Sequence, residues 1–185
     1  PNSHSIIING FINSNGQKMS KTVGNVVDPM DLIEQYGTEP LRYFVLRHCH
    51  AFEDSDFTME KFHEAYTANL VNGLGNLTSR LLTLGEKYLD QAPEIASNAT
   101  SVPESSIPQE FFDELEQFRI DRACDYIWKK IGELDTEITE KEPFKVAKVN
   151  LPEAQEMISD MLVKLYTIAR MLNPIMPEAN ATIKQ

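Results

Sequence analysis

Hydrophobic residues recur at helical spacing through most of the chain beyond Thr58. From Thr58 to residue 90, leucines stand three or four positions apart and therefore share one face of a predicted helix. Later segments repeat this pattern, with breaks at Pro143 and Pro174. Helices that each carry one apolar face bury it against one another, so the pattern predicts a mainly α fold, an antiparallel helix bundle. The leucines of the first stripe are Leu70, Leu74, Leu77, Leu81 and Leu84.

The N-terminal part is patterned differently. A β-branched run at residues 5–9 predicts the single good strand of the chain, and residues 10–24 are typical of a loop. Asp28, followed by a proline, predicts the start of a helix that ends near Gly37. Because a lone strand is not stable, we expect its partner strands in sequence that precedes this chain.

The change of pattern predicts two domains, residues 1–57 and residues 58–185. Within the second domain, residues 91–108 are rich in Ala, Pro and Ser and have no hydrophobic period. We expect them to form an exposed connection between helices.

Composition places the chain among ordinary soluble proteins. It has 185 residues, of which 42% are hydrophobic and 24% charged, unlike disordered chains. No apolar run approaches the roughly 18 residues that a membrane span needs, so no membrane partner is expected. Cys49 and Cys124 lie outside any CxxC pair, which favours a reducing, cytoplasmic setting. His48 and His50 flank Cys49, but alternate helix positions point apart, so no metal site is expected.

The net charge of −11 argues against general binding to nucleic acid. Acids and bases balance in residues 1–50, so the acidic excess lies in residues 51–185. A protein that coats nucleic acid is basic, because phosphate contacts supply most of its affinity. We therefore expect no DNA partner, and any RNA contact must rest on a few placed residues.

The loop contains the segment KMSKT: Lys18, Met19, Ser20, Lys21 and Thr22. It resembles the KMSKS signature of class I aminoacyl-tRNA synthetases, and the flanking residues 10–48 are similar to the methionyl-tRNA synthetases. The resemblance implies that these five residues bind ATP, with Lys21 as the main catalytic cation and Lys18 assisting. Thr22 replaces the usual serine and keeps the hydroxyl.

The residue types suit that chemistry. Negative charge develops on phosphate oxygens as pyrophosphate leaves, and cations aimed there lower the barrier. A loop can close over the triphosphate and then reopen. The spacing of a phosphate-binding P-loop is absent. The remaining alternative is that Lys18 and Lys21 are ordinary solvated lysines.

The predicted helix 58–90 carries YTANLVNGLGNLTSR, which is similar to the anticodon-binding signature of the same family. The resemblance places anticodon recognition on Asn76 and Arg80, although Thr67 and Asn69 depart from the family's usual pattern. Because Asn76 and Arg80 are i and i+4, both project from one helix face. An amide and a guanidinium can read the exposed edges of the CAU bases.

A third anticodon contact is implied at Phe144. The family often has Pro-Trp at this place, where the indole stacks on a base, and this chain has Pro143-Phe144. Phenylalanine can stack but lacks the indole N–H. A buried core phenylalanine beside a helix break is the alternative. Trp128 lies on an amphipathic helix and is expected in the core.

The resemblance implies a methionine–tRNA ligase, which couples methionine to ATP, with Mg²⁺, and then to tRNA(Met). Residues 1–57 would be a remnant of a Rossmann-like catalytic domain with the KMSKS-type loop. Residues 58–185 would be the helical anticodon-binding domain, truncated at its C-terminal end. No His-x-Gly-His motif is present, so the chain alone is expected to be inactive.

Two alternatives stay open at this point. Another class I synthetase would share the loop but not the helix with Asn76 and Arg80. A non-catalytic helical module that binds tRNA or protein is favoured mildly by the acidic charge.

Overall fold

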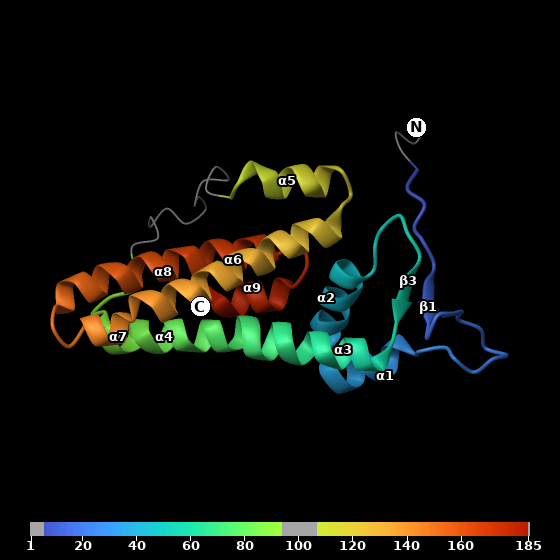
Figure 1. Cartoon of the computed structure of the whole chain (residues 1–185), viewed down its shortest axis with the longest axis horizontal. Coiled ribbons are helices and arrows are strands. Elements are labelled where there is room, and N and C mark those ends of the chain that lie inside the picture. Colours follow the sequence, from blue (N-terminus) through green and yellow to red (C-terminus); the bar gives the residue numbers. More distant parts are fainter. Residues whose placement is uncertain (1–5, 94–106, 185) are drawn as a thin grey trace.

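Helices occupy most of the computed structural model, which describes residues 6–93 and 107–184 (Figure 1). This confirms the expectation of a mainly α chain. Ser5 of the predicted strand and most of the predicted connection at 91–108 lie outside the described residues. The helical elements are α1 (Pro29–Tyr36), α2 (Thr38–His48), α3 (Met59–Ala65), η1 (Tyr66–Gly75), α4 (Asn76–Tyr88), α5 (Gln109–Glu116), α6 (Ile120–Lys141), α7 (Pro143–Val146), α8 (Leu151–Leu172) and α9 (Pro177–Ile183).

The first helices begin and end where the sequence predicts. The Asp28 side chain accepts a hydrogen bond from the Met30 N–H at 2.8 Å, which caps α1. Gly37, at φ 85°, ends α1 and donates its N–H to the Ile33 carbonyl. Thr58 caps α3 through Lys61 N–H. Local capping chemistry therefore sets these boundaries.

The expected strand at residues 5–9 is wrong, since residues 6–10 form no strand. The strands are β1 (Ile12–Ser14), β2 (Gln17–Lys18) and β3 (Ser55–Phe57). They form a sheet in the order β2-β1-β3, with β1 antiparallel to β2 and parallel to β3.

The turn chemistry explains this correction. Asn15 and Gly16 both have positive φ and join β1 to β2, and Asn-Gly is the strongest short signal for a two-residue hairpin. Ile6 and Ile8 have strand-forming side chains but remain 84% and 79% exposed. Strand propensity without a pairing partner does not make a strand.

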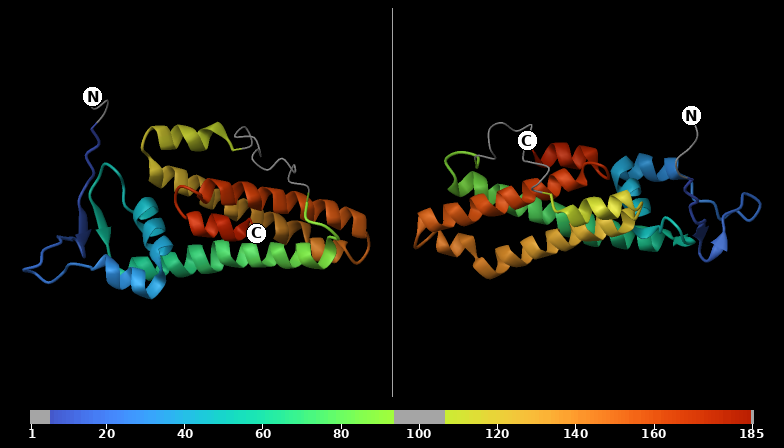
Figure 2. Two further views of the ribbon diagram at one scale, coloured as in Figure 1. Left: turned by 180° about the vertical axis from the view of Figure 1, so that it is seen from behind. Right: turned by 90° about the horizontal axis from the view of Figure 1, so that it is seen from above.

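Three long helices form the main body of the molecule, which Figure 2 shows from two further sides. Helix α8 packs against both α4 and α6 and runs antiparallel to them (Figure 1). The predicted leucine stripe is buried at Leu70, Leu74, Leu77 and Leu81. Trp128 is 8% exposed, with its ring centroid 4.4 Å from that of Tyr43, which confirms its core position.

The N-terminal helices are joined to this body by polar contacts as well as by a shared core. Arg47 of α2 pairs with Asp125 of α6 at 2.9 Å. Arg42 donates to the carbonyls of Pro174 and Ile175, both at 3.0 Å. One hydrophobic cluster continues across the predicted domain boundary between residues 57 and 58.

The expected single helix over 58–90 is interrupted in the middle. Between α3 and α4 the chain keeps its helical course, but Tyr66–Gly75 is a π-helix. In a π-helix each N–H reaches back five residues instead of four, so the turn is wider. The spacing of apolar residues along the sequence does not predict this local geometry.

Candidate functional site

The KMSKT segment forms an exposed loop that begins at the end of β2 and reaches away from the bundle (Figure 1). Asn25 closes its base: its Oδ1 accepts the Ser20 N–H at 2.8 Å, and its Nδ2 donates to the Lys18 carbonyl at 3.3 Å. The N–H groups of Val23 and Gly24 both donate to the Ser20 carbonyl, at 3.2 and 3.1 Å. The loop therefore has a defined turn while its tip faces solvent.

The five candidate ATP-binding residues differ in how they are held. Met19 is half-buried and packs against the hydrophobic core, while Lys21 and Thr22 are exposed. Lys18 Nζ lies 4.8 Å from the centroid of the Phe11 ring. Within the described residues, Lys21 forms no ion pair or hydrogen bond. Met19 thus anchors the loop to the core, while the unpaired Lys21 ammonium at the loop tip is available to bind an anion.

Two aspartates hold the hairpin that carries this loop. Asp54 Oδ1 accepts the Phe11 N–H at 2.8 Å, and Asp56 Oδ1 accepts the Gly16 N–H at 2.7 Å. The Gly16 hydrogen bond is the largest cause that lowers the pKa of Asp56. These two acids therefore fix the strand and the turn beside the loop.

Asn76 and Arg80 lie one turn apart on α4, and both are exposed, as their spacing predicts. Arg80 Nη1 pairs with Asp135 Oδ1 of α6 at 2.5 Å, and the two side chains are 45% and 52% exposed. Asn72, which the sequence reasoning leaves out, is also exposed four positions before Asn76. The face is polar and open to a ligand.

Phe144 is on the surface, 41% exposed, in the short helix α7. Its neighbour Pro143 is buried, and Glu142 before it has a left-handed backbone at φ 43°. The sharp turn after α6 therefore buries the proline and turns the phenylalanine outward. The alternative of a buried core position is wrong.

The structure does not bring the two candidate sites together. The KMSKT loop lies at one end of the long axis, and α7 lies near the other end (Figure 1). Arg80 contacts α6 through Asp135, and α6 leads directly into α7, which carries Phe144. Asp135 and the end of α6 are separated by about 9 Å of helix.

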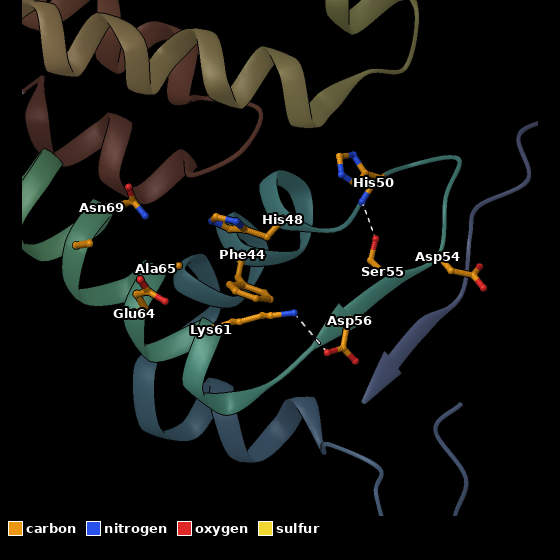
Figure 3. A pocket seen from close by; sticks show the side chains of 11 residues that line it. Phe44, His48, His50, Asp54, Ser55, Asp56, Lys61, Glu64, Ala65 and Asn69 are labelled. Carbon is orange, nitrogen blue, oxygen red and sulfur yellow. Dashed lines mark hydrogen bonds and ion pairs between the residues drawn. The ribbon is translucent and has the colours of Figure 1, made fainter. Parts of the chain in front are cut away.

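A cleft of about 630 Å³ lies beside β3, α2 and α3, and the candidate residues do not line it (Figure 3). Lys61 Nζ pairs with Asp56 at 3.4 Å, and His50 Nδ1 lies 3.0 Å from Asp121. Burial, followed by the charge of Arg47, lowers the pKa of His48. Lys61 and His50 are thus paired with carboxylates, and the lowered pKa of His48 disfavours its charged form. The cleft therefore offers no strong anion site.

His48 and His50 do not converge on a common point. His48 Nε2 lies 3.4 Å from the Tyr43 hydroxyl, whereas His50 turns to Asp121. Within residues 6–93 and 107–184, no group of three or more His, Cys, Asp or Glu side chains is placed to hold a metal ion. In the same residues no helix is long and apolar enough to cross a membrane.

Comparison with known proteins gives a consistent result. The family model for class I tRNA synthetases (M) matches residues 1–82. A methionine–tRNA ligase from Clostridium acetobutylicum is 34% identical over 95% of this chain, which spans 28% of that relative. One from Synechocystis is 31% identical over 95% of the chain and 35% of the relative.

Solved structures agree. Methionyl-tRNA synthetase from Mycobacterium tuberculosis, bound by methionyl-adenylate, superposes with a TM-score of 0.80 at 26% identity. The match covers 95% of this chain and 36% of that one. The described fold therefore corresponds to about a third of the solved enzyme.

Proposed function

Because this chain belongs to the methionyl-tRNA synthetases, which are class I enzymes, we propose that it forms part of a methionine–tRNA ligase. Within that enzyme, this chain contributes the loop that contacts ATP and the helices that recognise the tRNA(Met) anticodon. The observation that carries the proposal is the similarity to methionine–tRNA ligases along 95% of the chain. Since the chain spans 28% and 35% of those relatives, the complete reaction needs residues beyond it.

The loop chemistry follows from its donors. In activation, a methionine carboxylate oxygen bonds to the α-phosphorus of ATP as the bond to pyrophosphate breaks, and both electrons of that bond leave with pyrophosphate. Lys21, free and exposed, can meet the growing charge, with Lys18 beside it. Ser20 and Thr22 add hydroxyl donors. These groups suit phosphate oxygens, so Mg²⁺ would enter bound to the nucleotide.

The exposed face of α4 and the ring of Phe144 support anticodon recognition. Bases of a single-stranded loop present both hydrogen-bonding edges and flat faces. Asn76 and Arg80 offer donors to the edges, and Phe144 offers a stacking surface. A few placed contacts of this kind are compatible with a chain of net charge −11. The free cysteines Cys49 and Cys124 fit the reducing cytoplasm that we include in the proposal.

The direct test is a chimera. This chain replaces the matching segment of the Clostridium acetobutylicum enzyme, and charging of tRNA(Met) is measured with each of the standard amino acids. Charging of tRNA(Met) with methionine supports the proposal, because the chimera takes its ATP-contacting loop and its anticodon face from this chain. A folded chimera that charges no tRNA excludes it and favours the non-catalytic helical module.

Arg80→Ala is expected to weaken binding of a CAU anticodon stem–loop by about 1.5–3 kcal/mol, the strength of a hydrogen bond to a charged group. Stability should change little, because exposed ion pairs contribute about 0–1 kcal/mol. The measurements are RNA titration and thermal unfolding of the chain.

The matched control for Arg80 is Asp135→Asn, which breaks the same ion pair but leaves the guanidinium in place. It should keep or raise RNA affinity, since it removes an acid and frees Arg80. If both variants weaken RNA binding equally, Arg80 acts through its contact with α6 and not through the bases.

Phe144→Ala is expected to reduce stem–loop affinity by about 1–3 kcal/mol, the contribution of one stacked base. Phe144→Trp should bind at least as well as the natural chain, because the indole also stacks and adds a donor. Phe52→Ala serves as the control, since Phe52 is 56% exposed but lies in the N-terminal part. Equal losses for Phe144→Ala and Phe52→Ala in the same titration would show that no base stacks on Phe144.

A further inference from the structure

The π-helix η1 ends at Gly75, directly before Asn76. The Asn76 N–H donates to the carbonyls of Gly73 and Val71, three and five residues back, so the wide turn runs up to the first residue of the proposed anticodon face. π-helices are rare and occur frequently at functional sites. The position of η1 therefore links an unusual backbone to the residues proposed to read RNA.

Two glycines occupy the end of this segment. A Cβ built on Gly75 would lie 3.1 Å from the Leu70 carbonyl oxygen, and one on Gly73 would lie 3.3 Å from that of Ala68. Each of these carbonyls is five residues back, which is the π-helical partner position. Glycine is a poor residue for a helix interior, so two in three positions need a reason. The close approach of these carbonyls supplies it.

Gly132 provides a control within the same molecule. It lies inside the regular helix α6, and a Cβ added there would meet no atom within 4 Å beyond the backbone of its own helical turns. An alanine at Gly132 therefore adds no contact with another part of the chain.

The elements α3, η1 and α4 follow one another as one continuous helical rod. The packing on both sides of η1 fixes how this rod is rotated about its own axis. Phe62 and Ala65 of α3 are buried in the N-terminal part of the core, while Leu77 and Leu81 of α4 are buried in the bundle. In an α-helix each residue turns the chain by about 100°, so one residue more or fewer redirects every later side chain. The wide turn of η1 absorbs the difference in register between the two buried faces, and it sets where Asn76 points.

We propose that Gly73 and Gly75 are positioning residues that hold this π-helical turn and thereby aim Asn76 and Arg80 at the anticodon bases. The inference rests on the proposed function, because it assigns the two glycines to the same recognition. Methyl groups at these positions crowd the carbonyls that lie five residues back and favour a regular α-helical turn. That change rotates the face of α4 that carries Asn76 and Arg80.

The experiment measures discrimination between two RNAs with the full 185-residue chain. The probes are an anticodon stem–loop with CAU and the same stem–loop with one anticodon base changed. Gly75→Ala should reduce the preference for CAU by roughly tenfold, as expected when one hydrogen-bonded base contact is lost. Gly73→Ala, with the looser contact, should lose less and serves as the milder variant. Gly132→Ala should leave the preference unchanged.

The outcomes separate this inference from the proposed function. If the natural chain binds both RNAs equally, anticodon recognition itself fails. If the natural chain prefers CAU and both glycine variants keep that preference, the positioning role is overturned. An equal loss of affinity for both RNAs, together with a lower melting temperature in both variants, also overturns it, because damaged folding gives that result. A lost preference at an unchanged melting temperature in Gly73→Ala supports it.

Discussion

Lys21→Ala should slow the formation of methionyl adenylate by roughly 10²–10³-fold in an enzyme that contains this chain. That range is the cost of removing one preorganised group that stabilises developing negative charge. Lys21 is exposed at the loop tip and has no partner among the described residues, so its charge is free to meet phosphate oxygens. Lys18→Ala should have a smaller effect, since the Lys18 ammonium already forms a cation–π contact with the Phe11 ring.

The measurement is the rate of exchange between pyrophosphate and ATP in the chimera described above. Binding of the CAU stem–loop should be unchanged, because the loop and the face of α4 are well separated (Figure 1). Lys129→Ala removes an exposed lysine from α6 and should leave the exchange rate as it was. If Lys21→Ala exchanges as fast as the parent, the loop does not contact the triphosphate.

Glu39→Ala should lower the free energy of unfolding by about 2–3 kcal/mol. Glu39 is 9% exposed, and its two carboxylate oxygens accept the backbone N–H groups of Glu178 and Ala179, at 2.5 and 2.9 Å. These are orphan donors of the first turn of α9. Without the carboxylate both are unsatisfied, and because they are only partly buried each costs the lower part of the roughly 1–3 kcal/mol that a buried unsatisfied group costs.

Chemical denaturation of the whole chain tests this expectation. Glu39→Gln keeps one acceptor and should fall between Glu39→Ala and the natural chain. Glu34→Ala removes an exposed acid from α1 and should change the unfolding free energy little. Equal stability of Glu39→Ala and Glu34→Ala would mean that the contact between α2 and α9 contributes nothing.

Several local features were predictable because their causes lie within a few residues. Caps at Asp28 and Thr58, the end of α1 at Gly37 and the buried leucine stripe of α4 all follow from neighbouring residues and helical period. Two features were also encoded locally but were missed. Asn15-Gly16 marks the hairpin, and the repeated glycines before Asn76 coincide with the π-helix.

The candidate site divides in the same way. The motif identifies Lys18, Lys21, Asn76 and Arg80 by residue type and spacing, since those are properties of the chain itself. Their surroundings come from distant segments. Arg80 forms an ion pair with Asp135, and hydrogen bonds to Asp54 and Asp56 hold the hairpin that carries the loop. Local propensity cannot specify a partner that is forty or more residues away.

The sequence by itself determined where the helices start, which faces they bury and which residues carry the charge and amide groups of the proposed chemistry. Only the tertiary structure decided that β1 pairs with β3, that Phe144 faces solvent, and how the rod of α3, η1 and α4 is rotated. The reason is physical: caps and periodicity act between neighbours along the chain, whereas strand pairing, exposure and register depend on which distant surfaces meet.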